Sequence, residues 1–328
     1  MNQRIKKIFN KKVLKQILVS PWTALITLAL VVGLRVADPT FVERTRLTQF
    51  DSLITSKPEE VVGVSVVNID EKAIEKYGQF PFSRDVYGKI IRDLYARNAG
   101  LVVFNILTPD RDRMGRDSDY VQALRQHPTI LPNIGSTTTR NEPRTPGSVI
   151  VGPYGTDAFV TYPGIIANIA TLEDRAVGVG TVNTLPEVDG VNRRIPLITS
   201  VNGSLYPSLG MEILRVASGD DTTQIKLNEL GVEKMRIPHY GPISTDNLGR
   251  IWVDFSTPLN TYSITHLPKD FGGAIVVVGT SAAGLTNPLP TAKGAVYPQD
   301  VQASLIGTIA NGVNIQRPDW ADGAEILV

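Results

Sequence analysis

The sequence predicts an α/β protein in which an N-terminal transmembrane helix precedes a mixed, largely parallel sheet flanked by helices. Three observations support this fold class. Nineteen uncharged residues, 16–34, follow a cationic N-terminus. Two apolar segments of strand character, 61–69 and 101–107, flank an amphipathic helical pattern, and this order is typical of a right-handed parallel crossover. A further apolar segment, 274–279, precedes a helix expected at 298–311.

The N-terminal anchor is the first element. Residues 1–15 form a basic cytoplasmic tail with no acid and six cations, namely Arg4, Lys6, Lys7, Lys11, Lys12 and Lys15. Residues 16–36 are the expected transmembrane anchor, because nineteen residues at about 1.5 Å per residue match a hydrocarbon core of about 30 Å. The apolar run exceeds that of a signal peptide, and no small-residue cleavage site follows it. We therefore expect an uncleaved anchor with the cations inside and the remaining chain outside.

The body of the chain is expected to form one domain. Residues 37–57 are a juxtamembrane segment, residues 58–318 an extracytoplasmic domain, and residues 319–328 the approach to a possible second span. The hydrophobic pattern predicts strand 61–69, helix 70–77, a helix capped by Ser83, strand 101–107, helix 118–126 and strand 130–134, in this order. A long loop or hairpin is expected at 135–163, followed by strands paired around Asp189-Gly190 within 177–201. A helix 208–217 capped by Ser208 and strands 251–255 and 274–279 complete the domain before the last helix.

The composition excludes several kinds of site. The 33 cationic residues balance 32 acidic ones, so the chain lacks the basic footprint of a nucleic-acid-binding protein. Cysteine is absent, which removes thiol nucleophiles, disulfides and cysteine-ligated metals. The three histidines, His127, His239 and His266, are far apart in the sequence and disfavour a three-histidine metal site. We expect neither a metal nor a cofactor.

Two segments resemble known sites only in part. Residues 279–283, GTSAA, nearly match the G-x-S-x-G nucleophile elbow, but the last glycine is Ala283 and no histidine follows Ser281. A tight turn is the favoured interpretation. The four acids between Asp110 and Asp119 do not have the spacing of an EF-hand, and three arginines lie among them. We expect a solvated loop there, with Asp117 or Ser118 capping the next helix.

Five segments together resemble the type-two CHASE family, the extracytoplasmic sensor domain associated with bacterial cyclases and histidine kinases. They are VVGVSVVNIDEKAIEKYGQFPFSRDVYGKIIRDL from residue 61, GLVVFNILTPDRDRMGRDSDYVQAL from residue 100, DGVNRRIPL from residue 189, YPSLGMEILR from residue 206 and GAIVVVGTSAAGLTNPLPTA from residue 273. Their order and spacing agree with the family over about residues 50–315. No segment is specific by itself, but the set in this order is.

The resemblance also implies candidate ligand-binding residues. Those that match the family pattern are Asp70, Arg84, Asp189, Arg193 and Arg194. Asn105 and Asn287 join them, although the family usually has aspartate at both positions, so a cation-linked or proton-linked role for them is disfavoured. Structural ion pairing is the competing and stronger interpretation of the charged positions.

The expected function follows from the topology and the resemblance. The chain is expected to be a single-pass inner-membrane protein whose periplasmic bulk senses an unknown ligand or envelope state, without catalytic activity of its own. Its expected partners are the membrane, a second copy of the chain, and a cytoplasmic cyclase, kinase or phosphodiesterase output in a longer chain or another protein. Nucleic acid is not expected. A tethered periplasmic hydrolase using Ser281 or a carboxylate pair, or a structural envelope-interaction protein, are the alternatives.

Overall fold

The computed structural model describes residues 19–37, 39–53, 63–144, 147–152 and 155–312, together with residues 315 and 324. The chain divides into two compact units, Met1–Ile54 with Arg317–Val328, and Thr55–Gln316. The expected basic tail, residues 16–18 of the expected anchor and nearly all of the approach to a second span lie outside the described residues.

Two helices form the described part of the first unit, α3 (Pro21–Ala37) and α4 (Thr40–Leu53). Pro21 begins α3, at a position where the missing N–H has no helical partner to lose. None of the residues of α3 is buried, although the helix is mainly apolar. By length and composition no single described helix is able to cross a membrane, and only α3 taken together with Thr40–Ser52 passes, as a pair bent by 82°.

The second unit is built on a central sheet with the strand order β15-β1-β16-β2-β3. β15 (Asn260–Ser263), β1 (Val64–Ile69), β16 (Ile275–Thr280), β2 (Leu101–Phe104) and β3 (Thr129–Ser136) are parallel to their neighbours. β3 also pairs with β7 (Gly178–Thr181) in parallel and with β6 (Gly164–Ile166) in antiparallel orientation. The sheet is therefore mixed and largely parallel, as the sequence predicts.

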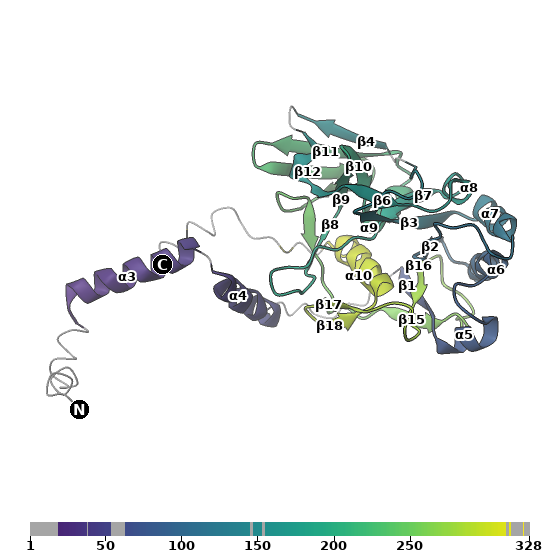
Figure 1. Ribbon diagram of the computed structural model, residues 1–328, viewed down its shortest axis with the longest axis horizontal. Coiled ribbons are helices and arrows are strands. Elements are labelled where there is room, and N and C mark those ends of the chain that lie inside the picture. Colours follow the sequence, from purple (N-terminus) through teal and green to yellow (C-terminus); the bar gives the residue numbers. More distant parts are fainter. Residues whose placement is uncertain are drawn as a thin grey trace. The chain divides into compact units, whose positions relative to one another are not determined.

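Helices cover both faces of this sheet (Figure 1). Val67 and Ile69 of β1 pack in a core with α5 (Glu71–Tyr77), α6 (Arg84–Tyr95), α7 (Asp117–Gln126) and α8 (Ala170–Glu173). Val64 and Val66 pack on the opposite face with α9 (Leu209–Ala217) and α10 (Pro298–Ala310). Strands buried on both faces require continuous apolar runs, which explains why β1, β2 and β16 are recognisable in the sequence.

A β-rich layer packs on the other side of α9 and α10. Val301 and Leu305 of α10 share a core with Ile225 and Met235 of this layer, so α10 is buried on two sides. Four small sheets lie outside the central sheet, with the strand orders β13-β12-β11-β4, β10-β9-β5, β14-β8 and β17-β18. Their strands are β4 (Gly147–Val151), β5 (Val160–Tyr162), β8 (Arg194–Pro196), β9 (Ile198–Val201), β10 (Ser204–Pro207), β11 (Thr222–Asn228), β12 (Gly231–Ile237), β13 (Gly241–Ile243), β14 (Arg250–Trp252), β17 (Leu289–Thr291) and β18 (Gly294–Val296). The short 3-10 helix η1 spans Thr156–Ala158.

The predicted pairing of strands within residues 177–201 is wrong. The turn itself forms, since the Gly190 N–H donates to the Glu187 carbonyl at 2.8 Å and Gly190 has a positive φ of 83°. The flanking strands separate instead of pairing: β7 adds to the central sheet beside β3, and β8 pairs with β14. A turn signal specifies a local chain reversal, whereas the partner of each strand depends on which open edge lies next to it.

The described residues of 135–163 contain more regular structure than the predicted loop or hairpin. They contain β4 and β5, which pair in parallel with β11 and β9. Both partners lie far along the chain, so the local pattern of prolines and glycines does not reveal the pairing.

Candidate functional site

The carboxyl edge of the parallel strands is the place where open α/β sheets usually bind ligands. Asp70 follows β1, Asn105 follows β2 and Ser281 follows β16. β1 leads to α5 on one face of the sheet, whereas β16 leads to α10 on the other face. Neighbouring strands whose connections leave in opposite directions define the switch point of the sheet, which makes this edge the first candidate site.

Most of the polar groups described at this edge join one element to another. The Gln299 side chain, at the start of α10, donates to Asn68 Oδ1 at 2.7 Å and to the Thr280 carbonyl at 3.2 Å. Glu71 accepts from the Ala283 N–H at 2.9 Å. The Asn105 N–H donates to the Val278 carbonyl at 2.8 Å. Asn287 is exposed in the segment after β16. These bonds hold the ends of β1, β2, β16 and α10 in place.

Asp70 is the N-cap of α5. Its Oδ1 accepts from the Ala73 N–H at 3.0 Å. We expect Asp70→Ala to lower the free energy of unfolding by about 1 kcal/mol, because one N–H at the start of the helix loses its partner. Asp70→Asn, which keeps the acceptor oxygen, is the matched control. Denaturant unfolding of both variants measures the difference, and equal stability of Asp70→Ala and the parent would contradict the capping role.

Arg84 begins α6 and is only 6% exposed. Its Nη2 donates to the Asp110 carbonyl at 3.2 Å, and its Nε lies 3.8 Å from Asp117 Oδ1. The guanidinium carbon lies 5.2 Å from the centre of the Tyr87 ring. Arg84 is therefore a buried cation at the first position of α6, the longer helix of the crossover from β1 to β2.

The acidic loop before α7 packs over the start of α6. Asp112 Oδ2 accepts from the Ser83 hydroxyl at 3.1 Å, from the Arg84 N–H at 3.4 Å and from the Arg116 N–H at 2.9 Å. Partial burial acts to raise the pKa of Asp112, but the backbone N–H groups outweigh it and lower that pKa below its ordinary value. Asp112, far along the chain, thus supplies the acceptor at the start of α6.

The predicted N-caps of α6 and α7 differ from those in the structure. Ser83 occupies the N-cap position of α6, but its side chain forms no capping bond. The N-cap position of α7 belongs to Arg116, and Asp117 lies in the first turn, where both carboxylate oxygens accept from the Asp112 N–H at 3.1 Å. The loop folds on itself because its aspartates accept from its own backbone.

The Tyr87 ring, which packs against Arg84, belongs to an aromatic cluster. Tyr87 lies 5.2 Å from Phe104 and 5.8 Å from Tyr120 between ring centroids, with Phe82 at 6.2 Å. The Oη of Tyr120 and the Nε of Arg84 are buried and have no hydrogen-bond partner. The Tyr87 Oη lies near the Arg84 guanidinium and the Phe82 N–H, but its own proton has no acceptor. Burial raises the pKa of Tyr87 to about 12, although Arg84 acts to lower it, and burial also raises the pKa of Tyr120. Both phenols are therefore protonated donors near neutral pH.

Neither tyrosine is among the ligand-binding candidates that the sequence indicates. Tyr87 follows Arg84 by three residues, a spacing that places both on one face of a helix, and this signal was available. Tyr120 belongs to α7, and nothing in its local sequence indicates that it lies beside α6.

The turn around residue 190 contains two ion-paired arginines. Arg193, 2% exposed, forms a bidentate pair with Asp189, at 2.9 Å from Nη1 to Oδ1 and 2.8 Å from Nη2 to Oδ2. The Arg193 guanidinium lowers the pKa of the Asp189 carboxyl. Arg194 pairs with Glu187 at 2.7 and 2.8 Å and with Asp246 at 3.0 Å. Carboxylates of the chain therefore occupy both guanidinium groups.

Each of the three histidines contacts a side chain other than Ser281. His127 stacks on Tyr95 with ring centroids 4.6 Å apart, His239 Nδ1 lies 2.6 Å from Asp220 Oδ1, and His266 Nδ1 lies 2.9 Å from the Thr265 hydroxyl. None of these contacts involves Ser281. In the part of the chain that the structure describes, no group of three or more histidines and acids is arranged to hold a metal ion.

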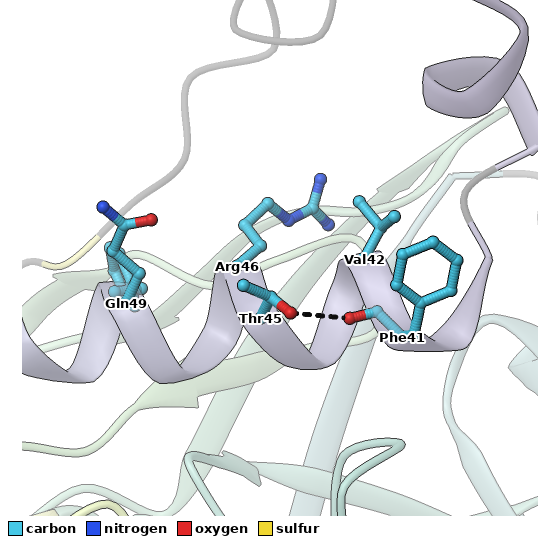
Figure 2. A pocket seen from close by; sticks show the side chains of 6 residues that line it. Phe41, Val42, Thr45, Arg46 and Gln49 are labelled. Atoms are coloured by element: carbon cyan, nitrogen blue, oxygen red, sulfur yellow. Dashed lines mark hydrogen bonds between the residues drawn. The ribbon is translucent and has the colours of Figure 1, made fainter. Parts of the chain in front are cut away.

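The first unit contains an open hollow on α4 (Figure 2). All of its lining residues belong to this one helix, and Phe41, Val42 and Phe50 supply its apolar side chains. The Thr45 hydroxyl donates to the Phe41 carbonyl at 2.8 Å, so it is satisfied within the helix. The hollow is a surface of α4 and brings no groups of different elements together.

The fold defines a class of protein: a three-layer α/β module whose sheet is largely parallel, extended by a β-rich layer. The particular family follows from the sequence. The model of the CHASE2 domain matches residues 26–328, so this chain belongs to the CHASE2 family, a family of extracellular sensory domains. The resemblance found in the sequence is thereby confirmed. Neither the curated proteins nor the solved structures include a significant match.

Proposed function

We propose that this chain is a membrane-anchored sensor whose second unit lies in the periplasm and detects a ligand or an envelope state for signalling across the inner membrane. The observation that carries the proposal is the match of the CHASE2 domain over residues 26–328. The proposal goes beyond the family because it assigns an anchor, a side of the membrane and a direction of signalling to this chain.

The exposed surface of α3 supports the anchor. Leu25, Ile26, Leu28, Leu30 and Val31 are each more than half exposed on a helix that has no buried residue. Apolar side chains exposed all along a helix are unfavourable in water and favourable in lipid. The six cations of residues 1–15 favour a cytoplasmic N-terminus and hence a periplasmic second unit.

Signalling is proposed to pass through the segments that join the two units. A ligand shifts a two-state balance only by the difference between its affinities for the two states. α10 is suited to respond, because it is buried between the central sheet and the β-rich layer and is the last helix described in the second unit. The output is proposed to be a cytoplasmic cyclase, kinase or phosphodiesterase in a longer chain or a partner, reached through a homodimer.

No catalytic step is part of the proposal. Ser281, the nucleophile of the alternative hydrolase, follows β16, and its N–H donates to the Ile69 carbonyl at 3.0 Å. The described contacts of all three histidines are with other residues. The contacts of Ser281 and of the histidines therefore favour a turn over a nucleophile elbow.

Single-cysteine labelling tests the topology, since the natural chain has no cysteine and each introduced thiol is unique. Ser204→Cys lies on an exposed residue of β10, and Lys11→Cys lies in the basic tail. With the outer membrane permeabilised, a membrane-impermeant maleimide is expected to label Ser204→Cys at once and Lys11→Cys only after lysis. The cysteine-free parent is the control. Labelling of Ser204→Cys only after lysis would place the second unit in the cytoplasm and overturn the proposal.

A further inference from the structure

Arg84 differs from the other buried arginines of the described chain. Arg193 and Arg215 each form a bidentate pair with a carboxylate, Asp189 and Glu212 respectively. Arg84 does not. Its ion-pair partner is Asp117, whose Oδ1 lies 3.8 Å from Arg84 Nε. This distance is too long for a hydrogen bond. Its guanidinium donates to the Asp110 carbonyl and lies near the Tyr87 hydroxyl oxygen, and neither of these acceptors is charged.

The neighbouring carboxylates are already occupied. Asp112 accepts from the Ser83 hydroxyl and from two backbone N–H groups, and both oxygens of Asp117 accept from the Asp112 N–H. Asp112 cannot turn toward Arg84 without losing its backbone donors, and a bidentate pair with Asp117 would take both carboxylate oxygens from the Asp112 N–H. A buried guanidinium normally requires a hydrogen-bonded anionic partner, and here the chain itself does not supply one.

Two buried phenols point to the same missing partner. Tyr87 and Tyr120 are fully buried, and the protons of their hydroxyl groups, like that of Arg84 Nε, have no acceptor. The Tyr87 ring packs against both the Arg84 guanidinium and the Tyr120 ring. Three unpaired donors therefore lie in one aromatic cluster, beside the end of β2. Natural proteins rarely leave buried donors unpaired, and such groups commonly mark a site for a bound molecule.

We propose that Arg84, Tyr87 and Tyr120 bind a small oxyanion, a short carboxylate or inorganic phosphate, and that this oxyanion is the ligand of the sensor. The role of this anion as a sensor ligand rests on the proposed sensory function. The oxygens of the anion accept from Arg84 Nε and from the two phenols, which satisfies all three donors. Because Asp117 lies 3.8 Å from Arg84 Nε and repels a second negative charge, the site favours a monovalent carboxylate over phosphate.

The loop from Asp110 to Asp117 is the segment that a ligand must displace to enter. It contacts Arg84 through the Asp110 carbonyl and packs over the start of α6 through Asp112. It is also tied to Arg140 by an ion pair with Asp110. Occupation of the site would therefore change the packing between α6, α7 and this loop.

Isothermal titration of the full chain in mild detergent tests the inference, with formate, acetate and phosphate as separate arms and chloride at matched ionic strength as the blank. Saturable binding of formate or acetate is expected, with phosphate weaker. Tyr87→Phe and Tyr120→Phe should each weaken that binding about tenfold, the loss expected for one hydrogen bond to a charged group. Without anion, neither variant should melt at a lower temperature than the parent, because each removes an unpaired hydroxyl.

Two matched variants of α6 provide controls. Tyr95→Phe removes a phenol whose hydroxyl already bonds to the Pro128 carbonyl, and Lys89→Gln removes an exposed cation paired with Asp93. Both should leave anion binding unchanged. Arg84→Gln should abolish it, and the tyrosine variants keep the test decisive if Arg84→Gln does not fold.

Several results would overturn the inference. One is the absence of saturable binding in all three anion arms, and another is binding that survives both tyrosine substitutions. A third is a lower melting temperature of both tyrosine variants with no response to any anion, which would show that ordered water satisfies the donors. If phosphate alone binds, the oxyanion is phosphate and the predicted preference for carboxylate is wrong. The cysteine-labelling result is independent of these outcomes, so the two proposals can fail separately.

Discussion

Arginines at positions 28 and 30 are expected to release the chain from the membrane fraction. Leu28 and Leu30 lie in the middle of the exposed apolar surface of α3. An arginine at the centre of a spanning helix costs about 2.5–3.5 kcal/mol in membrane insertion, so two cost about 5–7 kcal/mol. This cost exceeds the favourable insertion free energy of the apolar residues that remain in one short helix. We therefore expect most of the Leu28→Arg/Leu30→Arg protein to appear in the supernatant after alkaline extraction.

The matched control places the same two charges outside the expected anchor. Thr45→Arg/Gln49→Arg alters exposed positions of α4 and should sediment with the membranes as the parent does. If Leu28→Arg/Leu30→Arg resists extraction as well as the control, α3 is not the anchor. In cells with a permeabilised outer membrane, the double variant should also lose the labelling of Ser204→Cys before lysis, because the second unit then stays in the cytoplasm.

Removal of Arg215 is expected to have the largest effect on folding stability. Arg215 forms a bidentate pair with Glu212 within α9, at 2.8 Å from Nε and 2.6 Å from Nη2, and also donates to the Asp220 carbonyl. Glu212 is 1% exposed, so Arg215→Met leaves a buried carboxylate without its cation. Loss of one partner of such a pair costs about 3–5 kcal/mol, which denaturant unfolding at neutral pH measures.

The pH dependence of this variant has a definite sign. Burial raises the pKa of Glu212, and the hydrogen bonds from Arg215 oppose that rise. Without Arg215 the pKa of Glu212 in the folded state rises further above its value in the unfolded chain. The folded variant therefore binds a proton more tightly than the unfolded one, and its stability deficit relative to the parent should shrink as the pH falls from 8 to about 5.

Two controls separate charge burial from loss of packing. Glu212→Gln in the Arg215→Met background removes the buried charge and should restore part of the lost stability at neutral pH. Lys226→Met breaks an exposed pair with Glu233, whose side chains are 55% and 39% exposed, and should cost less than about 1 kcal/mol. A loss in Arg215→Met as small as that in Lys226→Met would contradict the importance of the buried pair.

The sequence predicts those elements whose pattern lies within a few consecutive residues, namely buried strands, helix caps and turns. The buried strands β1, β2 and β16 are continuous apolar runs, and the sequence predicts all three and the parallel order of the first crossover. Ser208 caps α9 through the Met211 N–H at 3.2 Å, as predicted, because the capping residue and its partner are three positions apart. The sequence also predicts a turn at Asp189-Gly190, and the chain turns there.

The candidate site was predicted only in part. The sequence singles out Arg84 through the family resemblance, and the structure places it in the aromatic cluster with Tyr87 and Tyr120. Asp189, Arg193 and Arg194 were candidates of equal standing, yet carboxylates of the chain occupy both of these arginines. A list of charged residues does not show which of them already have a partner inside the fold.

The sequence by itself determined the family, the apolar strands of the α/β core and the local caps and turns, because each depends on residues a few positions apart or on one ordered set of motifs. Only the tertiary structure decided that β7 joins β3, that Asp112 rather than Ser83 caps α6, and that Arg84 and two tyrosines of different helices share one buried cluster. These features pair groups that are far apart along the chain. Their partners are selected by packing and by the requirement that buried polar groups be satisfied, and no local pattern records that selection.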